Sequence, residues 1–488
     1  MKKYNVYVFL MAAVSLGGCK KYLDKEPDNR TQITSAEQVT QLLTSAYPRG
    51  NYILFCESMS DNSEDKDGGG AGLDFVDRIN RQAFRYEVIE AAPDDLDSPD
   101  FYWNSVYKAI AASNLALEII DNSANKAQLK AQRGEALLTR AYGHFMLVTL
   151  FAKAYDPATA ATDPGIPYVT APEKVVLAKY ERKTVAYVYE MIEKDLKEGY
   201  PLIDEKIYGT APKFHFNRQA AAAFATRFYL FKRDYSAVVS YGAQALTGAT
   251  AENLRPWDAT LQNLQYYDLQ AEYTKATLRG NLMLQEANSV WGRSYASLRY
   301  GLGTTVFTRI FNTVNPTGWY YAYPAYGTPA YYNIPKFFEH FVKESISAST
   351  GNPYNTIPLL TAEEVVLNRA EAYVRLNNRT AAIDDLNAFV SKNIDQYSTS
   401  DNVTAKKMVD FFKMPADTSG AIILTALEFK KAFFLHEGLR WFDILRLKIP
   451  VTHITSSGEI ITLGPDDKRR ALQLPVLTKQ AGLEPNAR

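Results

Sequence analysis

Two segments of this chain repeat the same spacing of small and large residues, and this repeat constrains the fold more than any other feature. In both segments the marked positions are separated by three, nine and four residues; they are Ala225, Phe228, Ala237 and Tyr241, and then Ala370, Tyr373, Ala382 and Leu386. Small residues at a close contact with large ones beside them are typical of the antiparallel helix pair of a tetratricopeptide repeat. Such pairs stack side by side and bury a shared face. We therefore predict a mostly α-helical protein with a tetratricopeptide-like scaffold of helix pairs.

Further helices are predicted in the N-terminal half of the chain. Apolar residues recur at helical spacing over residues 101–121 and 127–153. A third helix is expected over residues 184–199, with Thr184 as its N-cap and Gly199 at its end. These segments could add less regular pairs to the scaffold.

A long loop-rich insertion, at about residues 248–358, is expected to interrupt the scaffold. It contains Trp257, Trp291 and Trp319, many tyrosines and several turn sequences such as Gly351-Asn352-Pro353. Loops carried by a rigid scaffold are where binding residues usually lie, so we expect a ligand to bind in this insertion. A second irregular region is predicted over residues 51–100.

The N-terminus has the features of a secretory signal. Lys2 and Lys3 precede an apolar run, which ends in Leu16-Gly17-Gly18-Cys19 and is too short to remain as a membrane span. A cysteine at the cleavage point specifies a bacterial lipoprotein, in which Cys19 is acylated and becomes the new N-terminus.

This interpretation divides the chain into three parts. Residues 1–18 are the predicted signal peptide, and residues 19–36 are the lipidated N-terminus with a polar tether. Residues 37–488 are expected to form a single domain that the lipid holds at a membrane surface.

Composition excludes several classes of protein. Without Lys2 and Lys3 the chain has 54 − 2 = 52 basic residues against 54 acidic residues, so no positive surplus exists to drive nucleic-acid binding. The two cysteines include Cys19, which leaves no pair for a disulfide. Tyrosine is unusually frequent, with 33 residues, and its ring and hydroxyl together suit an amphipathic ligand as well as a helical core.

A charged and aromatic segment near the C-terminus has helical spacing. Glu437 and Arg440 lie one turn apart, as do Asp443 and Arg446, so each pair is expected to form a bridge on a helix surface. Because Trp441 and its apolar neighbours would form the buried side, we interpret this segment as structural and place no ligand there.

The same segment resembles a known family. The run Phe434-Leu435-His436-Glu437-Gly438-Leu439-Arg440-Trp441-Phe442-Asp443-Ile444-Leu445-Arg446 is similar to the Phe-Glu-Gly-x-Arg-Trp-Phe-Asp-x-x-Arg run of the SusD/RagB family of Bacteroidetes. It departs from that pattern in the extra His436 and in Lys430-Lys431, where the family has an arginine cluster. The helix Glu363 to Leu376 and the ending Gly482-Leu483-Glu484-Pro485-Asn486 also look like the family, so the resemblance covers essentially the whole mature chain.

The resemblance implies binding rather than catalysis. Members of the family are surface lipoproteins that cover a SusC/RagA-like TonB-dependent barrel in the outer membrane. They capture oligosaccharides or, in the RagB-like branch, peptides for import. For this chain we therefore expect a lipid-anchored outer-membrane protein that faces the cell exterior, needs no cofactor and binds no nucleic acid.

Aromatic side chains of the insertion are the candidate ligand platform. Sugar rings pack their C–H faces on aromatic rings, while tyrosine hydroxyls can meet sugar hydroxyls. The candidates are Trp257, Trp291 with Arg293, and the cluster Trp319, Tyr320, Tyr321 and Tyr323. Consecutive residues of an extended chain alternate sides, so only some of the cluster can face one ligand. For each candidate the alternative is packing in the core.

The acidic stretch around Asp61, Asp65 and Asp67 allows three interpretations. Its alternating oxygen ligands, followed by glycine, weakly resemble a calcium loop, but the closing bidentate glutamate is missing. It could instead form an acidic rim that attracts basic peptides, or a solvated loop on the side that faces the barrel.

Two other classes of function stay open alongside nutrient capture. A surface glycan hydrolase would need two carboxylates across a cleft, and sequence spacing cannot establish this arrangement. The familiar hydrolase, phosphate-loop and dinucleotide motifs are missing from the sequence. A non-transport adaptor would use the helical repeats to hold partner proteins.

Overall fold

Helices dominate the computed structural model, which describes residues 35–175, 178–343 and 345–488. The α-helices are α3 (Ala36–Leu43), α4 (Ile53–Met59), α5 (Asp74–Phe84), α6 (Pro99–Asn122), α7 (Lys130–Phe151), α8 (Val185–Gly199), α9 (Arg218–Lys232), α10 (Tyr235–Ala245), α11 (Tyr266–Tyr273), α12 (Trp291–Ser294), α13 (Thr304–Phe311), α14 (Ala362–Arg375), α15 (Arg379–Asn393), α16 (Ala405–Phe412), α17 (Thr418–Phe433) and α18 (Leu439–Arg446). The predicted mostly α fold is confirmed. The expected signal peptide, Cys19 and nearly all of the tether lie outside the described residues.

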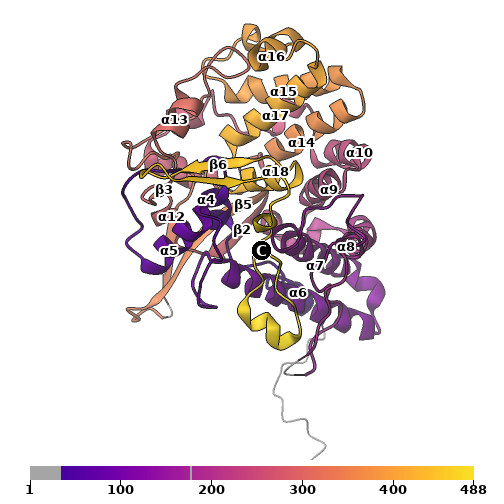
Figure 1. The fold of residues 1–488 in the computed structure, drawn as a ribbon. Helices are drawn as coiled ribbons and strands as arrows, with labels where there is room; N and C mark the ends of the chain where they lie inside the picture. Colours follow the sequence, from indigo (N-terminus) through magenta and orange to yellow (C-terminus); the bar gives the residue numbers. More distant parts are fainter. Residues whose placement is uncertain (1–34, 176–177, 344) are drawn as a thin grey trace, which may run out of the picture. The chain divides into compact units, whose positions relative to one another are not determined.

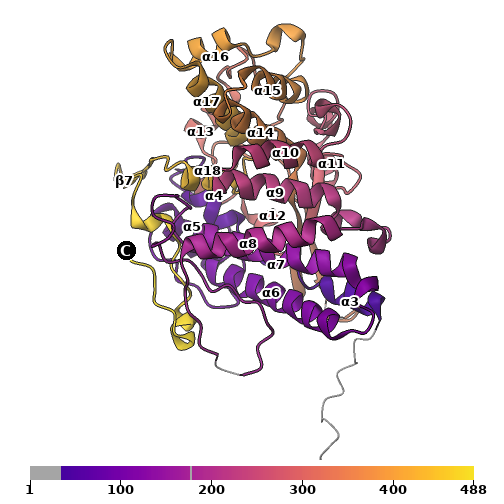
Figure 2. The same ribbon diagram turned by 90° about the vertical axis from the view of Figure 1, so that its right-hand side faces the viewer.

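The helices stack in an order that follows the chain. Figure 2 shows α6, α7, α8, α9, α10 and α14 as successive rows, with α15, α16 and α17 beyond them. The two repeated segments form the pairs α9/α10 and α14/α15, as the spacing predicts, and α10 packs against α14 to join the pairs. Ala225, Ala370 and Ala382 are completely buried, because only small side chains let the helix backbones approach this closely.

The same turn chemistry closes both helix pairs. Arg233 after α9 and Asn377 after α14 have positive φ angles of 65° and 60°, the left-handed conformation that ends a helix sharply. The next residue in each turn, Asp234 or Asn378, then caps the second helix by accepting a backbone N–H with its side chain. The local sequence therefore determines where the chain reverses direction between the two helices of each pair.

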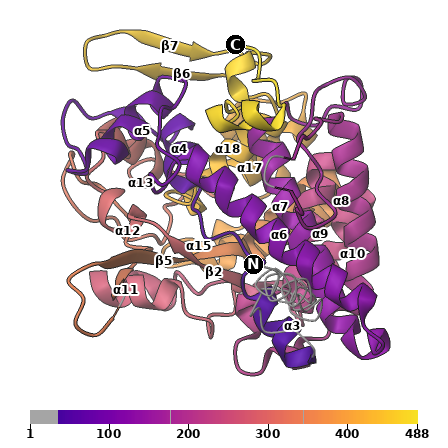
Figure 3. The same ribbon diagram turned by 90° about the horizontal axis from the view of Figure 1, so that it is seen from below.

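Short strands lie on the other side of the helical stack (Figures 1 and 3). The antiparallel strands β2 (Asn281–Asn288), β4 (Glu339–Lys343) and β5 (Gly351–Thr361) form a sheet in the order β2-β5-β4. β1 (Glu64–Asp65) pairs with β3 (Tyr300–Gly301), and β6 (Val451–Ile454) with β7 (Ile460–Leu463). The insertion is thus more regular than predicted, and the expected irregular region 51–100 contains α4 and α5.

Buried ion pairs connect helices within the stack and connect the stack, the insertion and the C-terminal segment to one another. Four of them lie almost entirely out of solvent: Arg227–Glu364, Arg255–Glu363, Lys336–Glu437 and Arg446–Glu371. The predicted Asp443–Arg446 bridge is confirmed at 2.6 Å. The predicted Glu437–Arg440 bridge is wrong, because Glu437 accepts hydrogen bonds from Lys336 and Tyr273 instead.

The described helices include none with the length and apolar character that crossing a membrane requires.

Candidate functional site

Four of the predicted ligand-binding aromatics are core residues. Trp257, Trp291, Tyr321 and Tyr323 are 0%, 1%, 7% and 5% exposed. The Trp291 indole N–H donates to the carbonyl of His436 at 3.1 Å, and Trp257 packs edge-on against Tyr323 with ring centroids 5.0 Å apart. Since their rings are covered by protein, these four residues offer no face to a ligand, and their prediction as a platform is wrong.

The other predicted residues of the insertion reach the surface. Trp319 and Tyr320 are 44% and 38% exposed and pack against each other edge-on, with centroids 5.6 Å apart. Arg293 is half-exposed, but its guanidinium is held by the carboxylate of Glu339. Trp319 and Tyr320 therefore remain as an exposed aromatic pair.

The acidic stretch is neutralised by basic side chains from distant parts of the chain. Asp61 accepts hydrogen bonds from Arg440 and Lys431, and Asp65 accepts two from Arg299. Asp67 is exposed, and its backbone N–H donates to Asp65. Over the described part of the chain, no three His, Cys, Asp or Glu side chains converge in a way that could hold a metal ion. The geometry thus gives the calcium hypothesis no support.

The two regions that the sequence analysis separated meet in one seam, which we define as residues 64–70 and 296–305. β1 pairs with β3, and the Lys66 ammonium donates to the carbonyl of Ala296 at 3.1 Å. Gly70 N–H donates to the carbonyl of Ser297 at 2.7 Å, and Glu64 accepts the backbone N–H of Thr305 near the start of α13. The acidic stretch and the insertion therefore form one continuous surface.

A polar hollow of about 390 Å³ opens beside this seam, against α5. It lies in the size range of roughly 300–1,000 Å³ that is usual for small-molecule sites. Its lining residues are Gly69, Asp77, Arg78, Asn80, Arg81, Arg299 and Tyr300. The hollow thus combines guanidinium donors, a carboxylate acceptor and an aromatic ring.

Tyr300 is held rigidly at this hollow. Asn80 exchanges two hydrogen bonds with its backbone, at 2.8 and 3.1 Å, and its ring stacks on Phe84 at 4.3 Å. The Arg299 guanidinium lies over the ring, 5.3 Å from its centroid. Burial raises the pKa of the Tyr300 hydroxyl, with Arg299 partly offsetting the effect, so this hydroxyl is a neutral donor at physiological pH.

Asp77 and Arg81 are the charged groups of the hollow that form no ion pair with the residues that the structure describes. Asp77 accepts one hydrogen bond, from the backbone N–H of Ala71 at 2.7 Å. Arg81 has no ion pair or side-chain hydrogen bond with the residues that the structure describes. By contrast, Arg78 is bonded to Asp95 and Arg299 to Asp65. Asp77 and Arg81 can therefore accept from and donate to the hydroxyls of a ligand.

Sequence reasoning missed this hollow. Asp77 and Arg81 are four residues apart on α5, a spacing that places them on one helix surface, but region 51–100 was expected to be irregular. No pattern in the sequence links Arg299 and Tyr300 to α5. They reach it through a tertiary contact between Tyr300 and Asn80, which are more than 200 residues apart in the chain.

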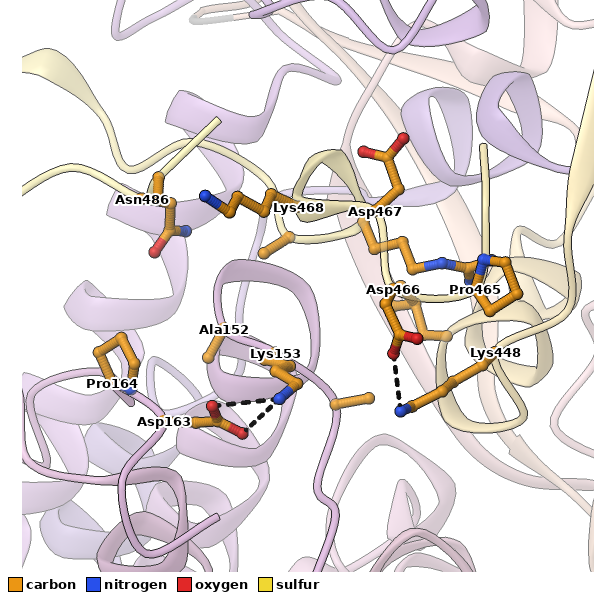
Figure 4. Close-up of a pocket in the computed structure, with 15 residues that line it drawn as sticks. Ala152, Lys153, Asp163, Pro164, Lys448, Pro465, Asp466, Asp467, Lys468 and Asn486 are labelled. Atoms are coloured by element: carbon orange, nitrogen blue, oxygen red, sulfur yellow. Dashed lines mark hydrogen bonds and ion pairs between the residues drawn. The ribbon is translucent and has the colours of Figure 1, made fainter. Parts of the chain in front are cut away.

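A second hollow, of about 450 Å³, lies between the end of α7 and the C-terminal segment (Figure 4). Ion pairs Lys153–Asp163 and Lys448–Asp466 stand on its two sides. Its lining includes no aromatic side chain among the described residues, so it lacks the stacking surface of a sugar site.

A third, smaller hollow of about 180 Å³ beside α6 does contain rings, those of Trp103, Tyr107 and Tyr180. Its hydroxyls are already used, because Tyr107 donates to the carbonyl of Pro167 and Tyr180 to Glu173. The hollow at the seam is therefore the best candidate for a hydroxyl-rich ligand.

Fold and hollow together define a helical-repeat protein with a polar recess where a loop-rich insertion meets the scaffold. Residues 21–230 match a family model, SusD-like, described as starch-binding and associating with the outer membrane. No curated protein sequence matches the chain.

Solved structures share this fold. A SusD superfamily protein from Bacteroides thetaiotaomicron has 17% sequence identity and a TM-score of 0.62, with 93% of this chain and 100% of that chain covered. A putative sugar-binding protein from Bacteroides vulgatus has 18% identity and a TM-score of 0.64, covering 93% and 99% of the two chains. A second B. vulgatus protein of the SusD superfamily has 17% identity and a TM-score of 0.66, with the same coverage. The chain thus shares the fold of SusD superfamily proteins, and residues 21–230 match the SusD-like family model, which agrees with the resemblance stated from the sequence.

Proposed function

We propose that this SusD-like protein captures an oligosaccharide at the outer face of the outer membrane and passes it to a TonB-dependent transporter. The lipid on Cys19 would hold the domain at the membrane, and the hollow at the seam would bind the ligand. The family model that matches residues 21–230 supports the ligand class and the membrane, because it is described as starch-binding and associating with the outer membrane.

The observation that carries the ligand class is the combination of groups in the hollow. Arg81 supplies free N–H donors and Asp77 a free acceptor, and the buried Tyr300 forms part of the wall beside them. A sugar presents hydroxyls that both donate and accept, so it can use both charged groups at once.

The alternatives receive less support. A hydrolase acting on glycans needs two carboxylates, and Asp77 is the one carboxylate among the residues that line the hollow. Basic peptides were expected to be attracted by an acidic rim, but Asp61 and Asp65 are neutralised by arginine and lysine side chains. An adaptor role would leave the hollow without a purpose.

Titration calorimetry of the mature protein with neutral oligosaccharides tests the ligand class, beginning with malto-oligosaccharides. Arg81→Gln and Asp77→Asn should each weaken binding by about tenfold, the effect of losing a hydrogen bond to a charged group. Asp77→Asn keeps a side-chain oxygen for the backbone N–H of Ala71, so the loop conformation is retained.

A matched control is Arg379→Gln, an exposed arginine at the start of α15 that should bind as wild type does. Glycan capture would be refuted if no oligosaccharide binds the folded protein. If glycans bind but both hollow variants match the control, the ligand lies elsewhere on the surface.

Mass spectrometry of the protein purified from native membranes in mild detergent tests the transport role. A co-purifying TonB-dependent barrel would support it. Purification of the protein alone would count against a transporter complex and favour an adaptor.

A further inference from the structure

The second hollow, shown in Figure 4, contains more positive charge than its carboxylates neutralise. Four cationic side chains line it: Lys153, Lys448, Lys468 and Arg470. Three carboxylates accompany them, those of Asp163, Asp466 and Asp467. None of these residues belongs to the seam or to the oligosaccharide site proposed above.

Two of the carboxylates are paired within the hollow and the third is paired outside it. Lys153 bonds to Asp163 at 3.0 Å, and Lys448 bonds to Asp466 at 2.9 Å. Asp467 is bonded to Arg469, which does not line the hollow. Asp156 lies farther out and is shared by Lys448 and Arg233, at 3.6 and 3.8 Å.

Lys468 and Arg470 have no carboxylate partner among the described residues. Arg470 is buried and donates to three main-chain carbonyls, those of Gly464, Ile444 and Ile449, at 2.6–2.9 Å. These acceptors are neutral, and Asp466 and Asp467 act on the Arg470 charge without forming an ion pair with it. The Lys468 ammonium extends along the rim of the hollow toward Asn486 and makes no hydrogen bond with the described residues.

We propose that this hollow is an anion site that binds a phosphate or sulfate monoester carried by a small molecule. Lys468 and Arg470, which form no ion pair with the described residues, attract a doubly charged group, and the half-exposed Lys153 and Lys448 can shift from their carboxylates to add donors. The volume of about 450 Å³ accommodates more than the anionic group, so the rest of a small molecule has room beside the apolar lining of Ala152, Pro164 and Leu445.

Thermal unfolding of the mature protein, titrated with inorganic phosphate and with sulfate, tests this proposal. Sodium chloride at equal ionic strength serves as the reference, because it reports general screening alone. Saturating phosphate or sulfate should raise Tm by about 2 °C over the chloride reference. Lys468→Gln should weaken the apparent affinity by about tenfold, while Lys468→Arg should retain it.

Lys126→Gln is the matched control, because Lys126 also begins a short 3₁₀ helix, is exposed and makes no ion pair with the described residues. It should respond as wild type does. The proposal is overturned if phosphate and sulfate act no differently from chloride. It is also overturned if Lys468→Gln leaves their saturable effect unchanged.

A second arm identifies where the monoester comes from. Glucose 6-phosphate in solution is compared with phosphatidylcholine vesicles that contain or lack phosphatidic acid. Both probes carry a phosphate monoester, and Lys468-dependent binding of either supports the site. Preference for the sugar phosphate assigns a soluble ligand, and preference for the vesicles assigns a lipid headgroup.

Discussion

Arg440 donates two hydrogen bonds to the carboxylate of Asp61, at 2.8 and 3.0 Å, and so connects residues 379 positions apart. Asp61 opens the acidic stretch, and Arg440 belongs to the C-terminal run that resembles the SusD family. Lys431 reaches the same carboxylate at 2.6 Å. The C-terminal run therefore fixes the position of Asp61, which lies three residues before the first residue of the seam.

Replacing Asp61 should destabilise the protein and change its response to acid. Asp61→Asn leaves Arg440 and Lys431 buried without a counter-charge, and the expected loss is about 2–4 kcal/mol of unfolding free energy at pH 7. Urea unfolding measures it. A loss below about 0.5 kcal/mol would show that this ion pair contributes little.

The acid dependence follows from the pKa of Asp61. Burial would raise this pKa, but Arg440 and Lys431 outweigh it and hold the pKa of Asp61 well below its usual range. The stabilisation is therefore complete above an unfolded-state pKa of about 3.9 and is lost as pH falls toward the folded-state value. The Asp61→Asn variant should lack this part of the decline below about pH 4.

Substitution of Trp291 should lower the stability of the protein much more than substitution of Trp319. Trp291→Ala removes a buried ring and its hydrogen bond to His436, so it should cost about 3–5 kcal/mol of stability. In the Trp319→Ala/Tyr320→Ala double variant, each substitution should change the unfolding free energy by less than about 0.5 kcal/mol, because both rings are exposed. Chemical denaturation of the two variant proteins measures both unfolding free energies and so distinguishes a core residue from surface residues.

The same exposed pair tests where the ligand binds. We expect the Trp319→Ala/Tyr320→Ala protein to bind oligosaccharides as wild type does, because the pair does not line the hollow and lies beside α15, where the backbone N–H of Asp395 donates to the carbonyl of Tyr320. Calorimetry with a series of oligosaccharide lengths measures this. Weaker binding would show that the exposed pair contacts the ligand.

The Arg227–Glu364 pair should be more sensitive to loss of one partner than of both. Arg227 donates to both carboxylate oxygens of Glu364, at 2.6 and 2.5 Å, and is 1% exposed. Glu364→Gln should cost about 3–5 kcal/mol, because a buried guanidinium loses its counter-charge. The Arg227→Met/Glu364→Gln double variant should cost less, and urea unfolding of a double-mutant cycle measures the difference.

The two capping residues should contribute similarly to stability. Asp234→Ala and Asn378→Ala each remove the side chain that caps the second helix of a pair, with an expected cost of about 1 kcal/mol. Ser236→Ala, in the first turn of α10, is the control and should be close to neutral. Thermal unfolding of the three variants provides the comparison.

Local features of the fold were predictable from sequence. The spacing of small and large residues identified both repeat pairs, and helix α8 begins after Thr184 and ends at Gly199 as expected. Asp443 and Arg446 form their predicted bridge because both lie within one helical turn. In each case the interacting residues are close in the chain, so their contacts follow from backbone geometry alone.

Partners distant in the chain were not predictable. Glu437 bonds to Lys336 rather than to Arg440, and Arg440 bonds instead to Asp61. Similarly, the tryptophans of the insertion differ only in tertiary packing, since Trp257 and Trp291 are buried and Trp319 is exposed. Residue type shows that a side chain can bind a ligand, and burial decides whether it is available.

The sequence by itself thus determined the helix pairs, their caps and the family resemblance, all of which depend on residues near one another or on a continuous run. Only the tertiary structure decided where a ligand could bind. The hollow exists because β1 pairs with β3 and brings Arg299 and Tyr300 to α5, beside Asp77 and Arg81. That contact spans more than 200 residues and depends on how the whole chain packs, so no local pattern encodes it.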